Sequence, residues 1–169
     1  TRALITEFTT VGCSACPSMK EVLHTIEEDA ALADMAICAE AHTGLINSVA
    51  DPCYLHNRAF EDFCVITGFP TVKLDLASTY NNGNRFDIKE DLQEVVAAKE
   101  AFAPGIAVNS VLKDGKVVAK VTVKAKVAAS YRVGTYLVED GIYAKQYSAT
   151  ADYMHTHDNV IRYIDAQHK

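Results

Sequence analysis

The hydrophobic pattern changes its period once along the chain, and this change limits the possible folds most strongly. In the first part, short apolar runs such as residues 3–8 and 35–41 alternate with segments whose apolar residues recur at helical spacing. From residue 106 onward, apolar and polar residues alternate, which is typical of strands with one buried face. Ala103-Pro104-Gly105 separates the two parts, because proline and glycine stop helices and favour turns.

Charge and cysteine are divided at the same place. Residues 1–102 hold seven Lys or Arg and 16 Asp or Glu, a net charge of −9, whereas residues 103–169 hold nine and six, a net charge of +3. The total of −6 argues against a nucleic-acid partner. No apolar stretch of about 18 residues is present, so no transmembrane helix is predicted. We therefore expect two units, residues 1–102 and residues 103–169.

The first unit has the pattern of an α/β fold. Strands are predicted at residues 3–8, 35–41 and 71–76, and amphipathic helices at about 14–29 and 87–102. Asp87 and Glu90 have the spacing of a capping box for the second of these helices. Residues 45–64 are expected to be helical in pieces. Strands that alternate with helices predict a largely parallel or mixed sheet covered by helices.

Cys13 and Cys16 form a CxxC pair between the first strand and the first helix. A helix N-terminus carries partial positive charge and favours a thiolate, so we expect Cys13 to be exposed and activated. Cys16 would lie within reach to resolve a mixed disulfide. A static disulfide and a metal site are the alternatives, although a zinc site normally needs a second ligand pair at similar spacing and none follows.

Two segments resemble the thioredoxin superfamily, and together they cover about residues 1–102. Residues 4–17 are similar to its first core strand and active-site helix, and residues 65–71 are similar to its segment ending in a cis-proline. The chain departs from that family at Gly12, where tryptophan is common, and at Ser14-Ala15, where Gly-Pro is common. These departures leave the redox potential and the choice of partner open.

The resemblance implies a role for several residues. Cys13 and Cys16 would be the redox pair, and Pro70 would be cis and packed beside Cys13. Phe69 and Thr71, on either side of this proline, would contact a peptide substrate. Glu7 would be a buried carboxyl group that exchanges a proton with Cys16, and burial would raise its pKa.

The remaining cysteines and the histidines allow weaker predictions. Cys38 is expected to be a small buried apolar residue. Cys53 and Cys64 are either a second disulfide, which would require an oxidising compartment, or two free thiols. His42, His56 and Cys53 have a spacing that fits no common metal site, and His155 and His157 with Asp158 are interpreted as a structural turn rather than a half-site. We predict no metal and no cofactor.

The second unit shows the clearest strands of the chain. Residues 106–112 and 117–127 are expected to form a hairpin, and residues 133–139 and 142–146 supply further strands. This pattern predicts an antiparallel β-sandwich of immunoglobulin type. Such a sandwich needs about seven strands and about 100 residues, so we expect the domain to be incomplete, or else to pack on the first unit or on a second chain.

Residues 136–142 and 153–162 resemble the twenty-eight-kilodalton outer-membrane lipoprotein family of anaerobic Gram-negative bacteria, which joins a thioredoxin-like domain to an immunoglobulin-like domain. The resemblance implies an exported protein of the periplasm or outer membrane, with a lipid anchor upstream of Thr1. The function expected is a cell-envelope thiol–disulfide oxidoreductase that acts on protein thiols or disulfides. The alternative is a surface binding protein or adhesin with a non-catalytic thioredoxin-like scaffold.

Overall fold

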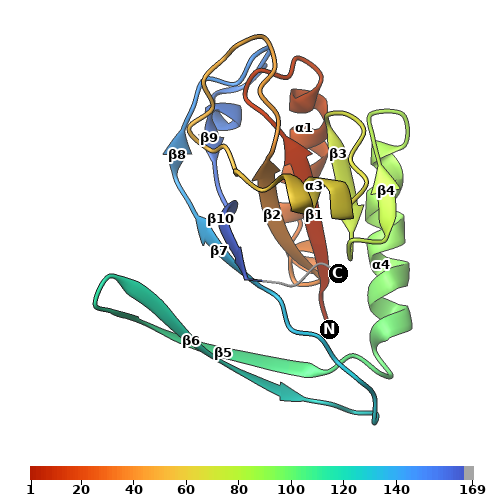
Figure 1. Cartoon of the computed structure of the whole chain (residues 1–169). Helices are drawn as coiled ribbons and strands as arrows, with labels where there is room; N and C mark the ends of the chain where they lie inside the picture. Colours follow the sequence, from red (N-terminus) through yellow and green to blue (C-terminus); the bar gives the residue numbers. More distant parts are fainter. Residues whose placement is uncertain (166–169) are drawn as a thin grey trace.

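The computed structural model describes residues 1–165, which form a mixed α/β fold around a six-stranded sheet (Figure 1). The strands are β1 (Ala3–Thr9), β2 (Ala36–His42), β3 (Thr71–Leu74), β4 (Ser78–Tyr80), β5 (Gly105–Lys113), β6 (Lys116–Lys124), β7 (Thr135–Glu139), β8 (Ile142–Tyr143), β9 (Thr156–His157) and β10 (Val160–Asp165). The helices are α1 (Cys16–Glu27), α2 (Ala30–Ala33), α3 (Arg58–Phe63) and α4 (Ile88–Lys99), with short 3-10 turns η1 (Arg85–Asp87) and η2 (Asp152–His155).

The central sheet has the strand order β4-β3-β1-β2-β10-β7. β1 pairs in parallel with β2 and antiparallel with β3, and this register sets Glu7 directly beside Glu40. Because side chains alternate between the faces of a strand, Ile5 and Glu7 point to one face and Phe8 to the other. The carboxyl pair Glu7–Glu40 therefore lies on the same face as the apolar residues that contact α1.

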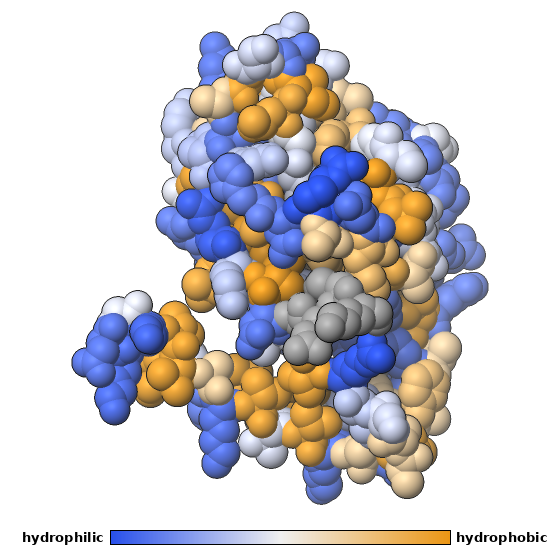
Figure 2. Space-filling view, in the orientation of Figure 1, coloured by the Kyte–Doolittle hydropathy of each residue, from blue (hydrophilic) through white to orange (hydrophobic). Residues whose placement is uncertain are grey.

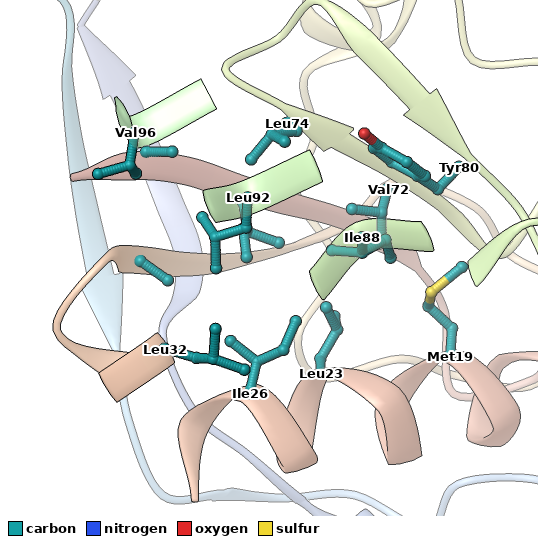
Figure 3. Packing of buried hydrophobic residues seen from close by; sticks show 13 residues of the cluster. Met19, Leu23, Ile26, Leu32, Val72, Leu74, Tyr80, Ile88, Leu92 and Val96 are labelled. Atoms are coloured by element: carbon teal, nitrogen blue, oxygen red, sulfur yellow. The ribbon is translucent and has the colours of Figure 1, made fainter. Parts of the chain in front are cut away.

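Two hydrophobic clusters cover the two faces of the sheet. The larger cluster joins α1, α2 and α4 to β1 and β3, with Met19, Ile26 and Leu92 fully buried (Figure 3). The second lies on the opposite face, where the ring of Phe8 packs against the tilted ring of Phe60 of α3, with centroids 5.4 Å apart. Burial of these side chains supplies the main driving force that holds the helices to the sheet.

The helices and strands predicted for residues 1–102 are confirmed within a few residues. α1 begins at Cys16 and α4 ends at Lys99. Asp87 occupies the predicted N-cap of α4, but its side chain makes no capping hydrogen bond, because η1 leads directly into the helix. In residues 45–64 the one helix that forms is α3, capped by the side chain of Asn57. No helix among residues 1–165 is long and apolar enough to cross a membrane.

The strands after residue 103 are arranged differently from the predicted sandwich. β10 pairs in parallel with β2 through Val160 and Glu40, and β7 pairs antiparallel with β10, so both extend the central sheet. Within residues 1–165 no immunoglobulin-like sandwich forms, because β10 pairs with β2 and β7 pairs with β10, so neither strand belongs to a separate sheet. The division of the chain at residues 102 and 103 stays a prediction.

β5 and β6 form the predicted hairpin, which projects away from the sheet (Figure 1). The register pairs Ile106 with Val123, Val108 with Val121 and Leu112 with Val117, which places these six side chains on one face. This face is open, with Leu112 78% exposed, and apolar atoms are visible on the projecting part in Figure 2. The lysines at 116, 120 and 124 lie on the opposite face, as expected for an amphipathic ribbon.

Candidate functional site

Cys13 and Cys16 form a disulfide where the loop after β1 enters α1. Cys16 is the first residue of the helix and Pro17 follows it, at a position where the missing N–H costs no helical hydrogen bond. Ala15 is the N-cap and offers no side-chain acceptor, so the helix N-terminus keeps its positive end toward the sulfurs. The predicted position of the pair is confirmed, and the structure shows its oxidised state.

Cys13 is buried, which contradicts the expectation that it would be exposed. It is 3% exposed and Cys16 is 2% exposed, whereas Ser14 and Ala15 between them reach the surface. The cover comes from chain segments distant in sequence. The side-chain amide of Asn47 donates to the carbonyl of Gly12 at 2.9 Å, and that of Gln146 donates to the carbonyl of Cys13 at 2.9 Å.

Backbone contacts reinforce this cover. A Cβ atom on Gly12 would lie 2.2 Å from the carbonyl oxygen of Ile46, so glycine is needed there for the two loops to touch. The backbone N–H of Tyr147 donates to the carbonyl of Val11 at 2.8 Å. The loops after β1, β2 and β8 thus meet at one end of the sheet (Figure 1), where Asn47 and Gln146 contact the backbone of Gly12 and Cys13.

Glu7 is a buried carboxyl group, as the resemblance implied. Its side chain and Cys16 line the same narrow gap, together with Lys20 of α1 and Glu40 of β2. The pKa of Glu7 is raised to about 8, mainly by burial and in smaller part by the negative charge of Glu40. Oxygen Oε1 of Glu7 is buried and has no hydrogen-bond partner among the described residues. Glu7 is therefore a protonated carboxylic acid at neutral pH.

Glu40 is the ionised member of the carboxyl pair. Burial would raise its pKa, but hydrogen bonds with His157 and His42 and the charge of Lys20 together hold that pKa well below its usual value. Lys20 Nζ donates to Glu40 Oε1 at 3.1 Å and to the carbonyl of Thr156 at 2.9 Å. Two neighbouring carboxyl groups thus carry one negative charge, and the proton stays on Glu7.

Two histidines complete this buried polar network. His42 Nε2 lies 3.2 Å from Glu40 Oε2, and its Nδ1 lies 2.8 Å from Asp51 Oδ2. Burial would lower the pKa of His42, but the hydrogen bonds with Asp51 and Glu40 outweigh it and raise the pKa to about 9. His157 Nδ1 lies 3.0 Å from Glu40 Oε2. Asp51 also accepts from the backbone N–H of Val11 at 3.0 Å, which ties the network to the loop before Cys13.

Sequence reasoning missed most of this network. His157 was interpreted as part of a turn, and its position over Glu40 depends on the pairing of β10 with β2, which no local pattern reveals. Glu40 gave one signal, since a charged residue within the apolar run 35–41 is unusual in a buried strand. His155 is separated from His157, because its Nδ1 accepts from the backbone N–H of Gln146 at 3.1 Å.

The peptide bond between Phe69 and Pro70 is cis, as predicted. The ring of Phe69 packs against Gly44, where a Cβ atom would meet it at 2.3 Å. Thr71 is buried and its hydroxyl donates to the carbonyl of Gly68 at 2.7 Å. The roles of Phe69 and Thr71 in substrate binding, and of Pro70 in positioning a peptide, stay predictions.

The other three cysteines are free thiols, so the second disulfide considered for Cys53 and Cys64 is not formed. Cys64 packs in the apolar cluster with Phe60, and Cys53 lies with the polar network, which separates their environments. Burial raises the pKa of all three thiols, to about 12 for Cys38 and Cys53 and about 11 for Cys64. Cys38 is half-buried rather than fully buried and faces the carboxyl group of Glu27.

A cavity of about 200 Å³ opens beside the network, between α1, β2 and residues 153–159. Its walls include Glu7, Lys20, Cys38 and Glu40. Tyr153 forms part of the rim and stacks on His24 of α1 with ring centroids 4.1 Å apart. The cavity gives the buried carboxyl pair a route toward solvent.

Comparison with known proteins identifies two solved structures with a similar fold. HBP35 of Porphyromonas gingivalis matches 96% of this chain and 56% of its own, with a TM-score of 0.68 and 15% identity. A structural-genomics protein from Agrobacterium tumefaciens matches 97% of this chain and 71% of its own, with a TM-score of 0.63 and 12% identity. The chain thus spans little more than half the length of HBP35. No protein-family model and no curated protein sequence matches the chain.

Proposed function

We propose that the protein is a thiol–disulfide oxidoreductase with a thioredoxin-like domain, and that Cys13 and Cys16 exchange electrons with protein thiols or disulfides. The observation that carries the proposal is the placement of Glu7. A buried carboxyl group with a pKa of about 8 lines the same gap as Cys16, and this value lies close to the ordinary pKa of a thiol, about 8.5. A proton can therefore pass between the two groups in either direction near neutral pH.

The reaction follows from the arrangement of the three groups. A partner thiolate attacks the sulfur of Cys13, the Cys13–Cys16 bond breaks, and the leaving thiolate of Cys16 takes the proton of Glu7. A second thiol of the partner then attacks the mixed disulfide and releases Cys13 as a thiolate, which leaves the partner oxidised and the pair reduced. The reverse sequence reduces a partner disulfide, with Glu7 removing the proton from Cys16 so that it attacks Cys13.

The buried position of Cys13 adds a requirement to this scheme. A partner reaches its sulfur only after the loop around Ile46 and Asn47 or the segment around Gln146 moves aside. Ser14 and Ala15 are exposed beside the sulfurs and offer the first surface that a partner would contact. We propose that the protein selects partners through this opening.

Export to the cell envelope is part of the proposal. It rests on the family resemblance of residues 136–142 and 153–162. A protein of the periplasm or outer membrane, anchored by lipid upstream of Thr1, would meet exported proteins whose cysteines need oxidation or reduction.

The alternative proposal is a surface binding protein in which the same fold is a non-catalytic scaffold. The burial of both sulfurs and the open apolar face of the β5–β6 hairpin favour it. Exposed apolar patches of this kind often contact other proteins.

A trapping experiment separates the two functions. In a Cys16→Ser variant, the freed thiol of Cys13 should form a stable mixed disulfide with oxidised glutathione or with disulfide-scrambled ribonuclease, detected by mass spectrometry. Cys64→Ser is the matched control, because it removes a buried thiol on the opposite face of the sheet and should leave insulin reduction unchanged. An inert Cys13 in the trapping variant, together with no insulin reduction by the native chain, would support the scaffold.

A further inference from the structure

His42, Cys53 and His157 come together from three separate segments of the chain. His42 ends β2, Cys53 lies in the loop before α3, and His157 belongs to β9. Each offers one ligand atom, and these atoms lie within 4.8 Å of one another. All three side chains are buried, at 1% exposure or less.

This group has the chemistry of a transition-metal site. Two imidazoles and a thiolate are ligands that Zn²⁺ accepts in a tetrahedral arrangement. The carboxylate oxygen Oε2 of Glu40 lies 3.0 Å from Nδ1 of His157 and can therefore orient that imidazole from outside the group. Asp51 holds Nδ1 of His42 at 2.8 Å, the kind of outer carboxylate that orients metal-binding histidines.

A second observation points independently to a missing ligand. The other nitrogen of His157, Nε2, is buried and has no hydrogen-bond partner among the described residues. A buried polar atom without a partner destabilises the fold, and a bound cation would satisfy it. The thiol of Cys53 is likewise left without a disulfide, close to this imidazole.

We propose that His42, Cys53 and His157 bind one zinc ion, with water in the fourth coordination position. Binding displaces the proton of the Cys53 thiol and the proton that His42 shares with Glu40, and both protons pass to solvent. The positive charge of Lys20, which lies 3.1 Å from Glu40, partly offsets the negative charges of Glu40, Asp51 and the thiolate. The proposal does not depend on redox activity of Cys13 and Cys16.

The site would connect segments that are far apart in the sequence, from residue 42 to residue 157. Its ligands connect β2, the loop that covers Gly12 and the C-terminal segment that supplies Gln146. His157 and Glu40 also line the gap that contains Cys16 and Glu7. A bound ion would therefore fix the cover over the disulfide and hold β9 against the sheet.

Cobalt serves as the spectroscopic probe for the test. The full chain, with Cys13–Cys16 oxidised and with no added reductant, is titrated anaerobically with Co²⁺. We expect a one-to-one complex with a thiolate-to-cobalt absorption band and the visible bands of a tetrahedral ion, and we expect Zn²⁺ to remove both. Zn²⁺ should also raise the unfolding temperature, because the assembled site binds it more tightly than the unfolded chain does.

Matched variants make the assignment specific. Cys53→Ser should abolish the thiolate band, and His157→Gln should weaken cobalt binding by more than an order of magnitude, whereas Cys64→Ser should leave both unchanged. Circular dichroism without metal establishes that each variant is folded. The proposal would be overturned if the native chain formed no saturable complex. It would also be overturned if folded Cys53→Ser and His157→Gln bound cobalt as tightly as the native chain does.

Discussion

Replacement of Glu7 by glutamine tests how the fold keeps a buried carboxyl group protonated in the gap that Cys16 also lines. The pKa of Glu7 is about 8 against an ordinary value of 4.5, and each pKa unit corresponds to about 1.4 kcal/mol, so ionising this group in the folded protein costs about 5 kcal/mol. Glutamine has nearly the same shape and does not ionise. Because Oε1 has no partner, the replacement also breaks no hydrogen bond at that atom.

The sign of the effect follows from where each state binds the proton. Below pH 4.5 Glu7 is protonated in the folded and the unfolded chain, so ionisation does not affect stability. Between pH 4.5 and about 8 the unfolded chain loses the proton and the folded chain keeps it, so stability falls as the pH rises. At pH 7 this loss amounts to about 3 kcal/mol, and Glu7→Gln avoids it.

Urea unfolding at pH 4 and pH 7 measures the difference, with the Cys13–Cys16 disulfide intact. We expect the free energy of unfolding of Glu7→Gln, relative to that of the native chain, to be about 3 kcal/mol higher at pH 7 than at pH 4. Glu94→Gln is the control, since this residue is exposed on α4, and its stability difference should not change with pH. A constant difference between Glu7→Gln and the native chain across this range would refute the reasoning.

Three further predictions test the cover and the core. Gly12→Ala should destabilise the fold by about 1–3 kcal/mol because its Cβ meets the Ile46 carbonyl, whereas Gly68→Ala, with open space around it, should be nearly neutral in the same urea titration. Gln146→Ala removes the hydrogen bond to Cys13 and should speed reduction of the disulfide by dithiothreitol severalfold, whereas the exposed-site variant Gln93→Ala should match the native rate. Tyr80→Phe deletes a 2.6 Å hydrogen bond to Asp91 and should cost about 1.5 kcal/mol in thermal unfolding; an unchanged stability would show that this bond contributes nothing.

Local patterns predicted the parts of the fold that depend on neighbours in sequence. Helical spacing of Met19, Leu23 and Ile26 located α1, because these residues must share one buried face. The position of the CxxC pair followed from the strand that precedes the helix, whereas the buried carboxyl group of Glu7 was implied only by the resemblance to the thioredoxin superfamily. Asp114-Gly115 located the turn of the hairpin, and both residues have the positive φ that such a turn requires.

Long-range pairing decided the rest. β10 is short and pairs with β2 across more than 100 residues of chain, so its place in the central sheet left no periodic signal. The cover over Cys13 depends on contacts with Asn47 and Gln146, and the latter is 133 residues away. The group His42, Cys53 and His157 was not predicted for the same reason, because its members lie far apart in the sequence and their spacing resembles no known metal motif.

The reduction potential of the Cys13–Cys16 disulfide tests the proposed function most directly. The full chain is equilibrated in dithiothreitol or glutathione buffers of graded potential, alkylated, and the two states of this pair are counted by peptide mass spectrometry, which separates them from Cys38, Cys53 and Cys64. A redox-active pair should show a midpoint between about −270 and −120 mV, the span of thiol–disulfide oxidoreductases. A pair that stays bonded in buffers below about −300 mV is a structural disulfide and would contradict the account.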